Sequence, residues 1–203
     1  MLQEASLFVV ADQVLVEVLG RIRPADAAVV LQPVVGLPAR SVPLPQAVRE
    51  HARDDARVPA LLAGRAEVGR QDDRSRQDDE RERDVTQDDV VRAAQAAFDA
   101  AAAVADGDAL VPSPEGALPV RELLLRLAVA RSLLAHYVAA HLGSTACPLP
   151  EELARPLWEL TAPDAAAWRR LGYYREPMPL PPHVSWRDRF LLEAGHEPHP
   201  VHS

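Results

Sequence analysis

The sequence predicts an all-α protein organised around one long, buried helix. Although 48% of the residues are hydrophobic, only 4% are aromatic, and an apolar content supplied mainly by Ala, Leu and Val favours helices over a β-sandwich. The stretch 118–143 has Pro119 in its expected first turn, no Pro or Gly in its interior, and Gly143 at its end. Proline in the first turn and glycine just after the last turn are the usual signals for the start and end of a helix. Its apolar residues lie on nearly every face, which is typical of a helix inside a core.

Length and composition predict a single compact domain in the cytoplasm. A chain of 203 residues can bury a substantial core. The net charge of -8 argues against a nucleic-acid partner. The lone Cys147 cannot form an internal disulfide, which fits a reducing compartment. The first residues lack the basic region of a secretory signal. Arginines interrupt the one stretch long enough to cross a membrane, so we expect no membrane partner.

Three further helices are predicted before the central one, and with it they form a core over residues 1–143. Apolar residues recur at helical spacing over 2–21, 45–64 and 86–105. Thr86 is the expected N-cap of the third of these, and Pro59 should kink or break the second. The four helices therefore account for most of the predicted core.

Three connections join these helices, and the first two are the most distinctive in sequence. Residues 24–45 contain five prolines and should form an extended link, because proline excludes a regular helix. Residues 65–89 are strongly polar, with the triplet QDD three times. We interpret them as a solvated connector. The alternative, an acidic metal-binding loop, lacks the glycine and the ligand spacing of a calcium loop.

Residues 144–203 form the predicted C-terminal extension. Prolines divide it into short helices expected near 150–160, 163–172 and 185–194. Six of the nine aromatic residues of the chain lie in it: Trp158, Trp168, Tyr173, Tyr174, Trp186 and Phe190. Aromatic side chains anchor packed surfaces and interfaces. We therefore expect the extension to pack on the helical core or on a second subunit, and we expect a homodimer.

The common catalytic motifs are missing from the sequence. It contains no Gly-rich phosphate loop, no GxSxG elbow, no CxxC pair and no HExxH motif. Nucleotide hydrolysis, α/β-hydrolase chemistry and the common zinc-protease mechanism are thereby excluded as leading interpretations.

The histidines are the best candidates for a functional site. His51 and Asp55 are four residues apart and share a helix face. His136 and His141 are five apart in the central helix and point about 140° away from each other, so at most one belongs to a given site. If the two helices are neighbours, His51, Asp55 and His136 converge on a divalent ion and leave positions open for water or substrate. In the alternative, His51 lies on the surface and His136 is a core histidine satisfied by a carbonyl or by Ser132.

We expect no functional site at the three C-terminal histidines or at the cysteine. His196, His199 and His202 lie in a proline-interrupted tail, where flexible chain with weak adventitious metal binding is the expectation. Cys147 has no His or Arg beside it in the sequence, and we interpret it as structural.

Three segments carry a resemblance to a known family. They are EHARDDARVPALLAG around His51, ARSLLAHYVAAHLG around His136, and the ending WRDRFLLEAGHEPHP. The chain resembles the DinB-like superfamily and, within it, actinobacterial proteins near the N-terminal domain of mycothiol-dependent maleylpyruvate isomerase. The ending is similar to the DRLLAxxGRDP ending of a metal-binding subgroup. A GC-rich bacterial source also fits the composition, because all 22 basic residues are Arg.

The resemblance implies a fold and a site. The fold is an up-down-down-up four-helix bundle, with residues 65–89 as the long crossover between its second and third helices. The site is a divalent metal ion, zinc or nickel, held by three protein ligands, with a low-molecular-weight thiol such as mycothiol as cosubstrate. His51 and His136 match two of the family's ligand positions. Ser132 stands where the family commonly has Glu or His, so Asp55 is the expected third ligand.

Two functions follow from the resemblance. In the first, the protein is a metal- and thiol-dependent transferase or isomerase acting on a small molecule. In the second, it is a non-catalytic bundle with a degenerate metal site that acts in binding or dimerisation. A purely structural helical protein outside this superfamily is the third interpretation.

Overall fold

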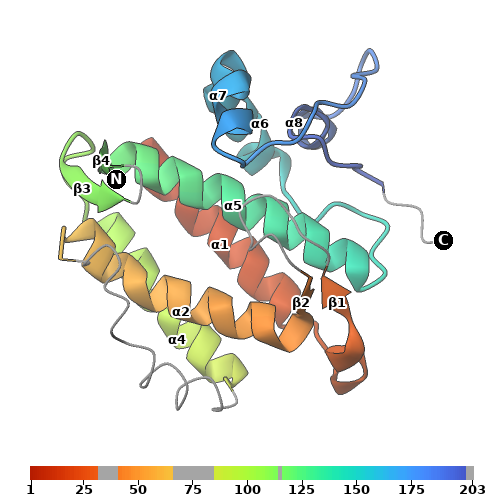
Figure 1. Cartoon of the computed structure of the whole chain (residues 1–203), viewed down its shortest axis with the longest axis horizontal. Coiled ribbons are helices and arrows are strands. Elements are labelled where there is room, and N and C mark those ends of the chain that lie inside the picture. The colour runs from red at the N-terminus through yellow and green to blue at the C-terminus, as the bar shows by residue number, and fades with distance from the viewer. Residues whose placement is uncertain (32–40, 66–84, 114–115, 200–203) are drawn as a thin grey trace.

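The structure, a computed structural model, describes residues 1–31, 41–65, 85–113 and 116–199 (Figure 1). It is mostly helical, which confirms the all-α prediction. Most of the polar segment 65–89 lies outside the described residues, as does His202. The predictions for these parts of the chain stay predictions.

Four long helices occupy the predicted ranges: α1 (Gln3–Leu19), α2 (Leu44–Leu62), α4 (Gln87–Ala102) and α5 (Val120–His141). Thr86 is the N-cap of α4, as predicted. Its Oγ1 accepts a hydrogen bond from the amide of Asp89, and the Asp89 carboxylate accepts one from the amide of Thr86. This reciprocal pair satisfies two donors that the first helical turn would otherwise leave unpaired. Pro59 lies inside α2, within its last turn and a half, and the helix continues past it.

The long helices pack against one another in pairs (Figure 1). α1 lies along α5, α2 lies along α4, and α1 also contacts α4. Among the described helices, only α5 is long and apolar enough to cross a membrane, and 61% of its most apolar stretch is buried inside the molecule. The core helix of a compact domain has the same properties, and α5 fills that place here.

Short antiparallel hairpins occupy parts of the connections. β1 (Val30–Leu31) pairs with β2 (Val42–Pro43), and β3 (Leu110–Ser113) pairs with β4 (Gly116–Pro119). A 3-10 helix (Pro24–Ala28) precedes β1, so the link predicted as extended contains a helical turn at its start. Proline tolerates the first turn of a helix as readily as an edge strand, which explains both outcomes in one segment. Pro119 is the N-cap of α5, one position before its predicted place in the first turn.

The C-terminal extension contains α6 (Glu151–Thr161), α7 (Ala165–Arg170) and α8 (Trp186–Glu193), close to the predicted ranges. α6 packs on α8 and contacts both α1 and α5, and the three helices gather on one side of α5 (Figure 1). Trp168 stacks on Tyr174 with ring centroids 5.7 Å apart, and Tyr174 meets Phe190 edge-on at 6.4 Å. These rings build a small core of their own within the extension.

Candidate metal centre

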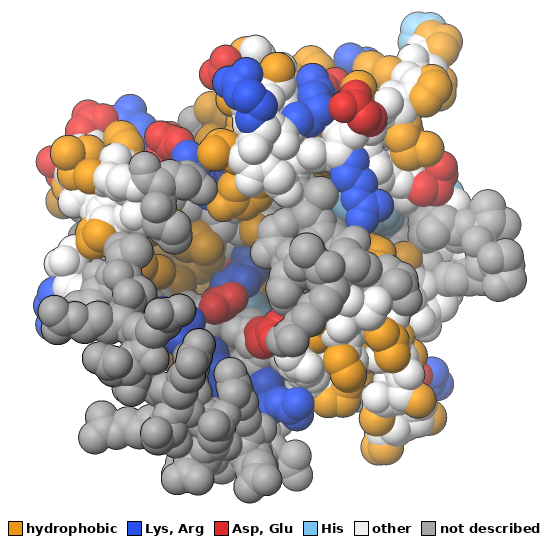
Figure 2. Space-filling model, in the orientation of Figure 1, with side chains coloured by type: hydrophobic (Ala, Val, Ile, Leu, Met, Phe, Trp, Pro, Cys, Tyr) orange, Lys and Arg blue, Asp and Glu red, His pale blue; other side chains and the backbone are white. Residues whose placement is uncertain are grey.

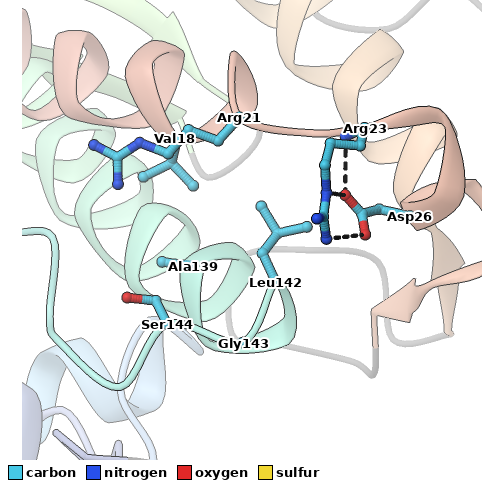
Figure 3. Close-up of a pocket in the computed structure, with 8 residues that line it drawn as sticks. All are labelled: Val18, Arg21, Arg23, Asp26, Ala139, Leu142, Gly143 and Ser144. Atoms are coloured by element: carbon cyan, nitrogen blue, oxygen red, sulfur yellow. Dashed lines mark hydrogen bonds and ion pairs between the residues drawn. The ribbon is translucent and has the colours of Figure 1, made fainter.

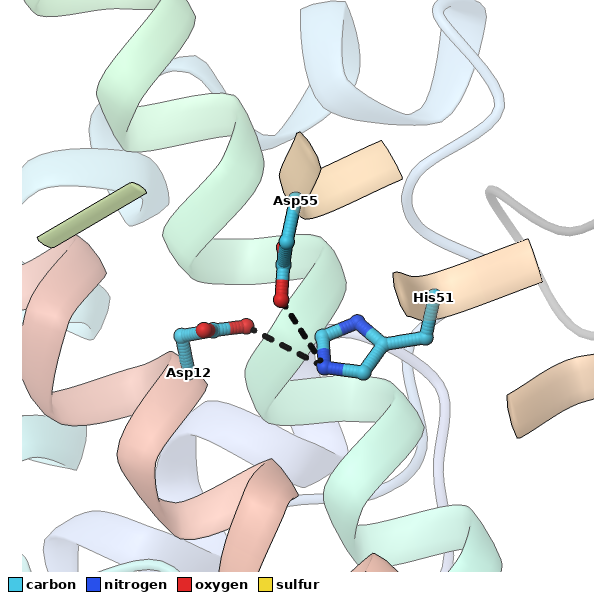
Figure 4. Close-up of side chains that lie close together, drawn as sticks. All are labelled: Asp12, His51 and Asp55. Atoms are coloured by element: carbon cyan, nitrogen blue, oxygen red, sulfur yellow. Dashed lines mark ion pairs between the residues drawn. The ribbon is translucent and has the colours of Figure 1, made fainter. Parts of the chain in front are cut away.

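Two helices bring three potential metal ligands together in the core (Figure 4). Asp12 comes from α1, and His51 and Asp55 come from α2. Their nearest ligand atoms all lie within 4.8 Å of one another. Nε2 of His51 is 3.1 Å from Oδ2 of Asp55 and 3.6 Å from Oδ1 of Asp12. All three side chains are buried, with Asp12 and Asp55 fully inaccessible.

Helical periodicity places these side chains inside. Asp12 lies on the same face of α1 as Phe8 and Leu15, which are fully buried against the other helices. His51 and Asp55 are four residues apart on the inward face of α2. A carboxylate and an imidazole that would otherwise face solvent are therefore carried into the core by the apolar residues around them.

Arg131 of α5 is the fourth member of the cluster. Its Nη2 donates to Oδ1 of Asp55 at 2.8 Å, and its Nε lies 3.2 Å from Oδ1 of Asp12. The guanidinium is buried as well. It brings one positive charge to two carboxylates. Figure 2 shows acidic and basic side chains near the centre of one face, whereas Asp12 and Asp55 have no exposed surface and lie beneath the surface of the molecule.

Burial sets the protonation of the cluster. Burial and then the negative charge of Asp55 raise the pKa of Asp12 to about 8. Burial also raises the pKa of Asp55, against the opposing charge of Arg131. Burial, with the charge of Arg131 acting in the same direction, holds the pKa of His51 well below its usual range. At neutral pH His51 is therefore neutral with a free lone pair, and Asp12 keeps a proton that a metal ion would displace.

The cluster could hold a metal ion. Two atoms that each bind one ion at about 2.1 Å, at angles of 90–110°, lie about 3.0–3.4 Å apart. The two separations from His51 Nε2 are close to this range. Among the described residues, both oxygens of Asp12, both ring nitrogens of His51 and Oδ2 of Asp55 form no hydrogen bond, and Oδ1 of Asp12 and Oδ2 of Asp55 have only ion-pair contacts, with Arg131 and His51. Buried polar atoms without a partner are costly, and coordination to a cation would satisfy them.

The structure places His136 elsewhere. It brings His51 and Asp55 together, as the sequence predicted, but the third ligand of this cluster is Asp12. Nε2 of His136 lies 2.9 Å from the carbonyl oxygen of Glu197, in the C-terminal extension. Burial lowers the pKa of His136, and the Glu197 carbonyl opposes that shift. His136 is thus the core histidine satisfied by a carbonyl that the sequence left open as an alternative.

Ser132 and His141 also lie on the central helix, and neither belongs to the cluster. Ser132 is fully buried, and its Oγ has no hydrogen-bond partner among the described residues. His141 is exposed at the end of α5, where its Nδ1 lies 3.0 Å from the carbonyl oxygen of Tyr137.

Sequence reasoning missed Asp12 and Arg131. Both lie on the buried faces of their helices, and a charged residue on a buried face needs an opposite charge or a metal ion nearby. That signal was present in the sequence. It could not say which partner each residue meets, because that depends on how α1, α2 and α5 pack.

The C-terminal tail was predicted to be flexible, but part of it is buried, whereas Cys147 is buried in keeping with its predicted structural role. His196 is buried, and burial lowers its pKa to about 4, so this part of the tail is packed against the protein. His199 is exposed, with Nε2 3.7 Å from Oδ1 of Asp188. Cys147 is buried, and burial raises its pKa to about 11. A thiol so reluctant to ionise suits the structural role predicted for it.

A separate cavity of about 390 Å³ lies where α1 and α5 end (Figure 3). Val18, Ala139 and Leu142 give it an apolar lining. Arg23 borders it and is held by hydrogen bonds to Asp26. The cavity shares no residue with the metal cluster.

Comparison of the chain with protein-family models, with curated proteins and with solved structures gave no match. A functional assignment therefore rests on the chemistry of the cluster. The cluster could hold a metal ion, as the geometry of Asp12, His51 and Asp55 shows.

Proposed function

We propose that this protein binds a divalent metal ion, zinc or nickel, through Asp12, His51 and Asp55. The observation that carries the proposal is one neutral imidazole and two carboxylates whose ligand atoms meet in the core without hydrogen-bond partners. Imidazole nitrogen suits zinc and nickel, and carboxylates complete many such sites.

The fold that we propose for this site is a DinB-like four-helix bundle. α1, α2, α4 and α5 would be its helices, and the segment between α2 and α4 would be its long crossover. The pairing of α1 with α5 and of α2 with α4 is what supports this arrangement. The resemblance of the segment around His51 to actinobacterial DinB-like proteins supports it independently.

Three protein ligands leave coordination positions open, and we propose that a small molecule uses them. A bound divalent ion supplies Lewis-acid activation, lowering the pKa of a thiol such as mycothiol. His51 offers its lone pair because it is neutral, and Arg131 fixes the Asp55 carboxylate through Oδ1, which leaves Oδ2 directed at the site. The buried setting excludes bulk water. This arrangement suits a metal- and thiol-dependent transferase or isomerase in the cytoplasm.

Arg131 favours a second candidate, a non-catalytic bundle. Its guanidinium already brings a positive charge to both carboxylates. A buried cluster of this kind can persist as a purely structural ion network, in which the histidine and the aspartates need no metal. In that case the protein acts in binding or dimerisation.

Metal analysis of untagged protein separates the two candidates. The parent protein for this test carries His199→Ala and His202→Ala, so that tail histidines contribute no metal. We expect one zinc or nickel per chain by inductively coupled plasma mass spectrometry, lost in both His51→Ala and Asp12→Asn. His141→Ala is the matched control and should keep the metal. His136→Gln should keep it too, because His136 lies outside the cluster.

Two results would reject metal binding at this site. One is a parent protein with no metal above background, which leaves the structural network. The other is full metal content in His51→Ala, which would place the ion elsewhere in the chain.

A further inference from the structure

Arg131 gives the cluster an unusual charge. A metal site made only of two carboxylates and one imidazole balances a divalent ion by itself. Here a guanidinium lies within 3.2 Å of one carboxylate and 2.8 Å of the other. The side chains of Arg131, Asp12 and Asp55 are at most 7% exposed.

The charges of the occupied site do not cancel. The ion brings two positive charges and Arg131 brings a third, whereas Asp12 and Asp55 bring two negative charges. His51 must be neutral to coordinate a metal. The sum is one positive charge in a dry environment, where an uncompensated charge is strongly disfavoured.

Outside the cluster, Asp54 is a neighbouring carboxylate whose negative charge acts on Asp55, but it acts from the surface. Asp54 feels the charge of Arg131 but its side chain is 55% exposed and lies 3.9 Å from Arg57. Glu50 acts on Asp54. Water and Arg57 therefore screen these outer carboxylates from the ion.

Building on the proposed function, we propose that Arg131 makes the metal centre anion-requiring: a divalent ion binds tightly only together with one singly charged anionic ligand. A small carboxylate and a thiolate share this chemistry, since each brings one negative charge on a metal-binding atom. The anion fills a position that the three protein ligands leave open. By linkage, the anion and the ion tighten each other's binding by the same factor.

The test measures zinc affinity by competition with a chromophoric chelator, in chloride-free buffer with ionic strength held by sodium perchlorate. Sodium acetate is the anionic probe, and acetamide is its neutral counterpart of similar shape. We expect acetate to tighten zinc binding by about tenfold or more, and acetamide to leave it unchanged. 2-Mercaptoethanol in a parallel arm shows whether a thiolate replaces the carboxylate.

Substitutions at Arg131 decide whether its charge is the cause. Arg131→Gln should bind zinc tightly without acetate and show no acetate effect. Arg131→Lys keeps the charge and should keep the effect. Arg126→Gln is the matched control on the same helix, because Arg126 pairs with Glu122 outside the cluster, and it should behave like the wild type.

The outcomes are distinguishable from those of the metal proposal. Wild-type protein that binds zinc equally well with and without either anion overturns this inference and leaves metal binding intact. An acetate effect that persists in Arg131→Gln also overturns it. Wild-type protein that binds no zinc under any condition rejects the metal proposal itself. If Arg131→Gln is unfolded without metal, Arg131→Met takes its place as the neutral variant, and an acetate effect that persists in it overturns the inference.

Discussion

At the scale of single residues, hydrogen bonding and burial shift the pKa values of carboxylates in this protein in opposite directions. Asp26 and Asp89 lie at helix starts, where hydrogen bonds from Arg23 and Thr86 lower their pKa values. Asp12 is enclosed by apolar side chains, and its pKa rises to about 8. The same functional group is thus a surface cap in two places and a buried carboxyl that retains its proton near neutral pH in the third.

Asp12 should make the metal-free protein less stable as the pH rises. An acid whose folded pKa lies above its unfolded value contributes stability below about pH 4, and loses it as the pH rises through about 8. In Asp12→Asn this loss should disappear, because the amide does not titrate. Urea denaturation with EDTA at a series of pH values checks this. A wild type and variant with parallel profiles between about pH 4 and 8 would contradict the shift.

At the scale of elements, local punctuation fixes where helices begin and end. α8 ends at Glu193, and the chain reverses through Gly195 at a positive φ of 77°. A Cβ at Gly195 would lie 2.5 Å from the carbonyl oxygen of Glu176 and 2.6 Å from the Cβ of Arg175. Only glycine allows the extension to fold back so closely on itself.

Gly195→Ala should therefore destabilise the protein by more than a helix-end glycine normally would. Gly172 has nearly the same φ, 78°, but a Cβ added there would meet no atom within 4 Å, so Gly172→Ala is the matched control. We expect about 1 kcal/mol for the control, from backbone strain alone, and about 2 kcal/mol or more for Gly195→Ala, where a clash adds to that strain. Equal losses in chemical denaturation would show that the close approach is absent.

At the scale of the whole molecule, histidines join the C-terminal extension to the helical core. His136 on α5 meets the carbonyl oxygen of Glu197, and His196 lies buried beside it, with His136 and Arg175 both opposing its protonation. α6 adds contacts to α1 and α5. The extension is thus attached through groups that must stay neutral.

Acid should weaken this attachment. Burial lowers the pKa of His196 to about 4, so its contribution to stability is complete above about pH 6.5 and is lost as the pH falls through about 4. The full shift corresponds to about 3 kcal/mol. Hydrogen exchange should show earlier opening of the segment after α8 at mildly acidic pH in the wild type, and less pH dependence in His196→Gln. Exchange that is independent of pH after correction for intrinsic rates would contradict the prediction.

The helices of this protein were predictable because their signals are local. Proline and glycine mark the ends of α5, Thr86 marks the start of α4, and prolines separate the helices of the extension. The pairing of His51 with Asp55 was predictable for the same reason, since residues four apart share a helix face wherever the helix lies.

By itself, then, the sequence determined an all-α protein with a histidine and a carboxylate on one helix face. Only the tertiary structure decided what that face meets. It places Asp12 and Arg131 beside His51 and Asp55. It also places His136 against the carbonyl oxygen of Glu197. The rotation of a side chain about its own helix is set by local spacing, whereas the neighbour that it meets is set by the packing of all the helices together.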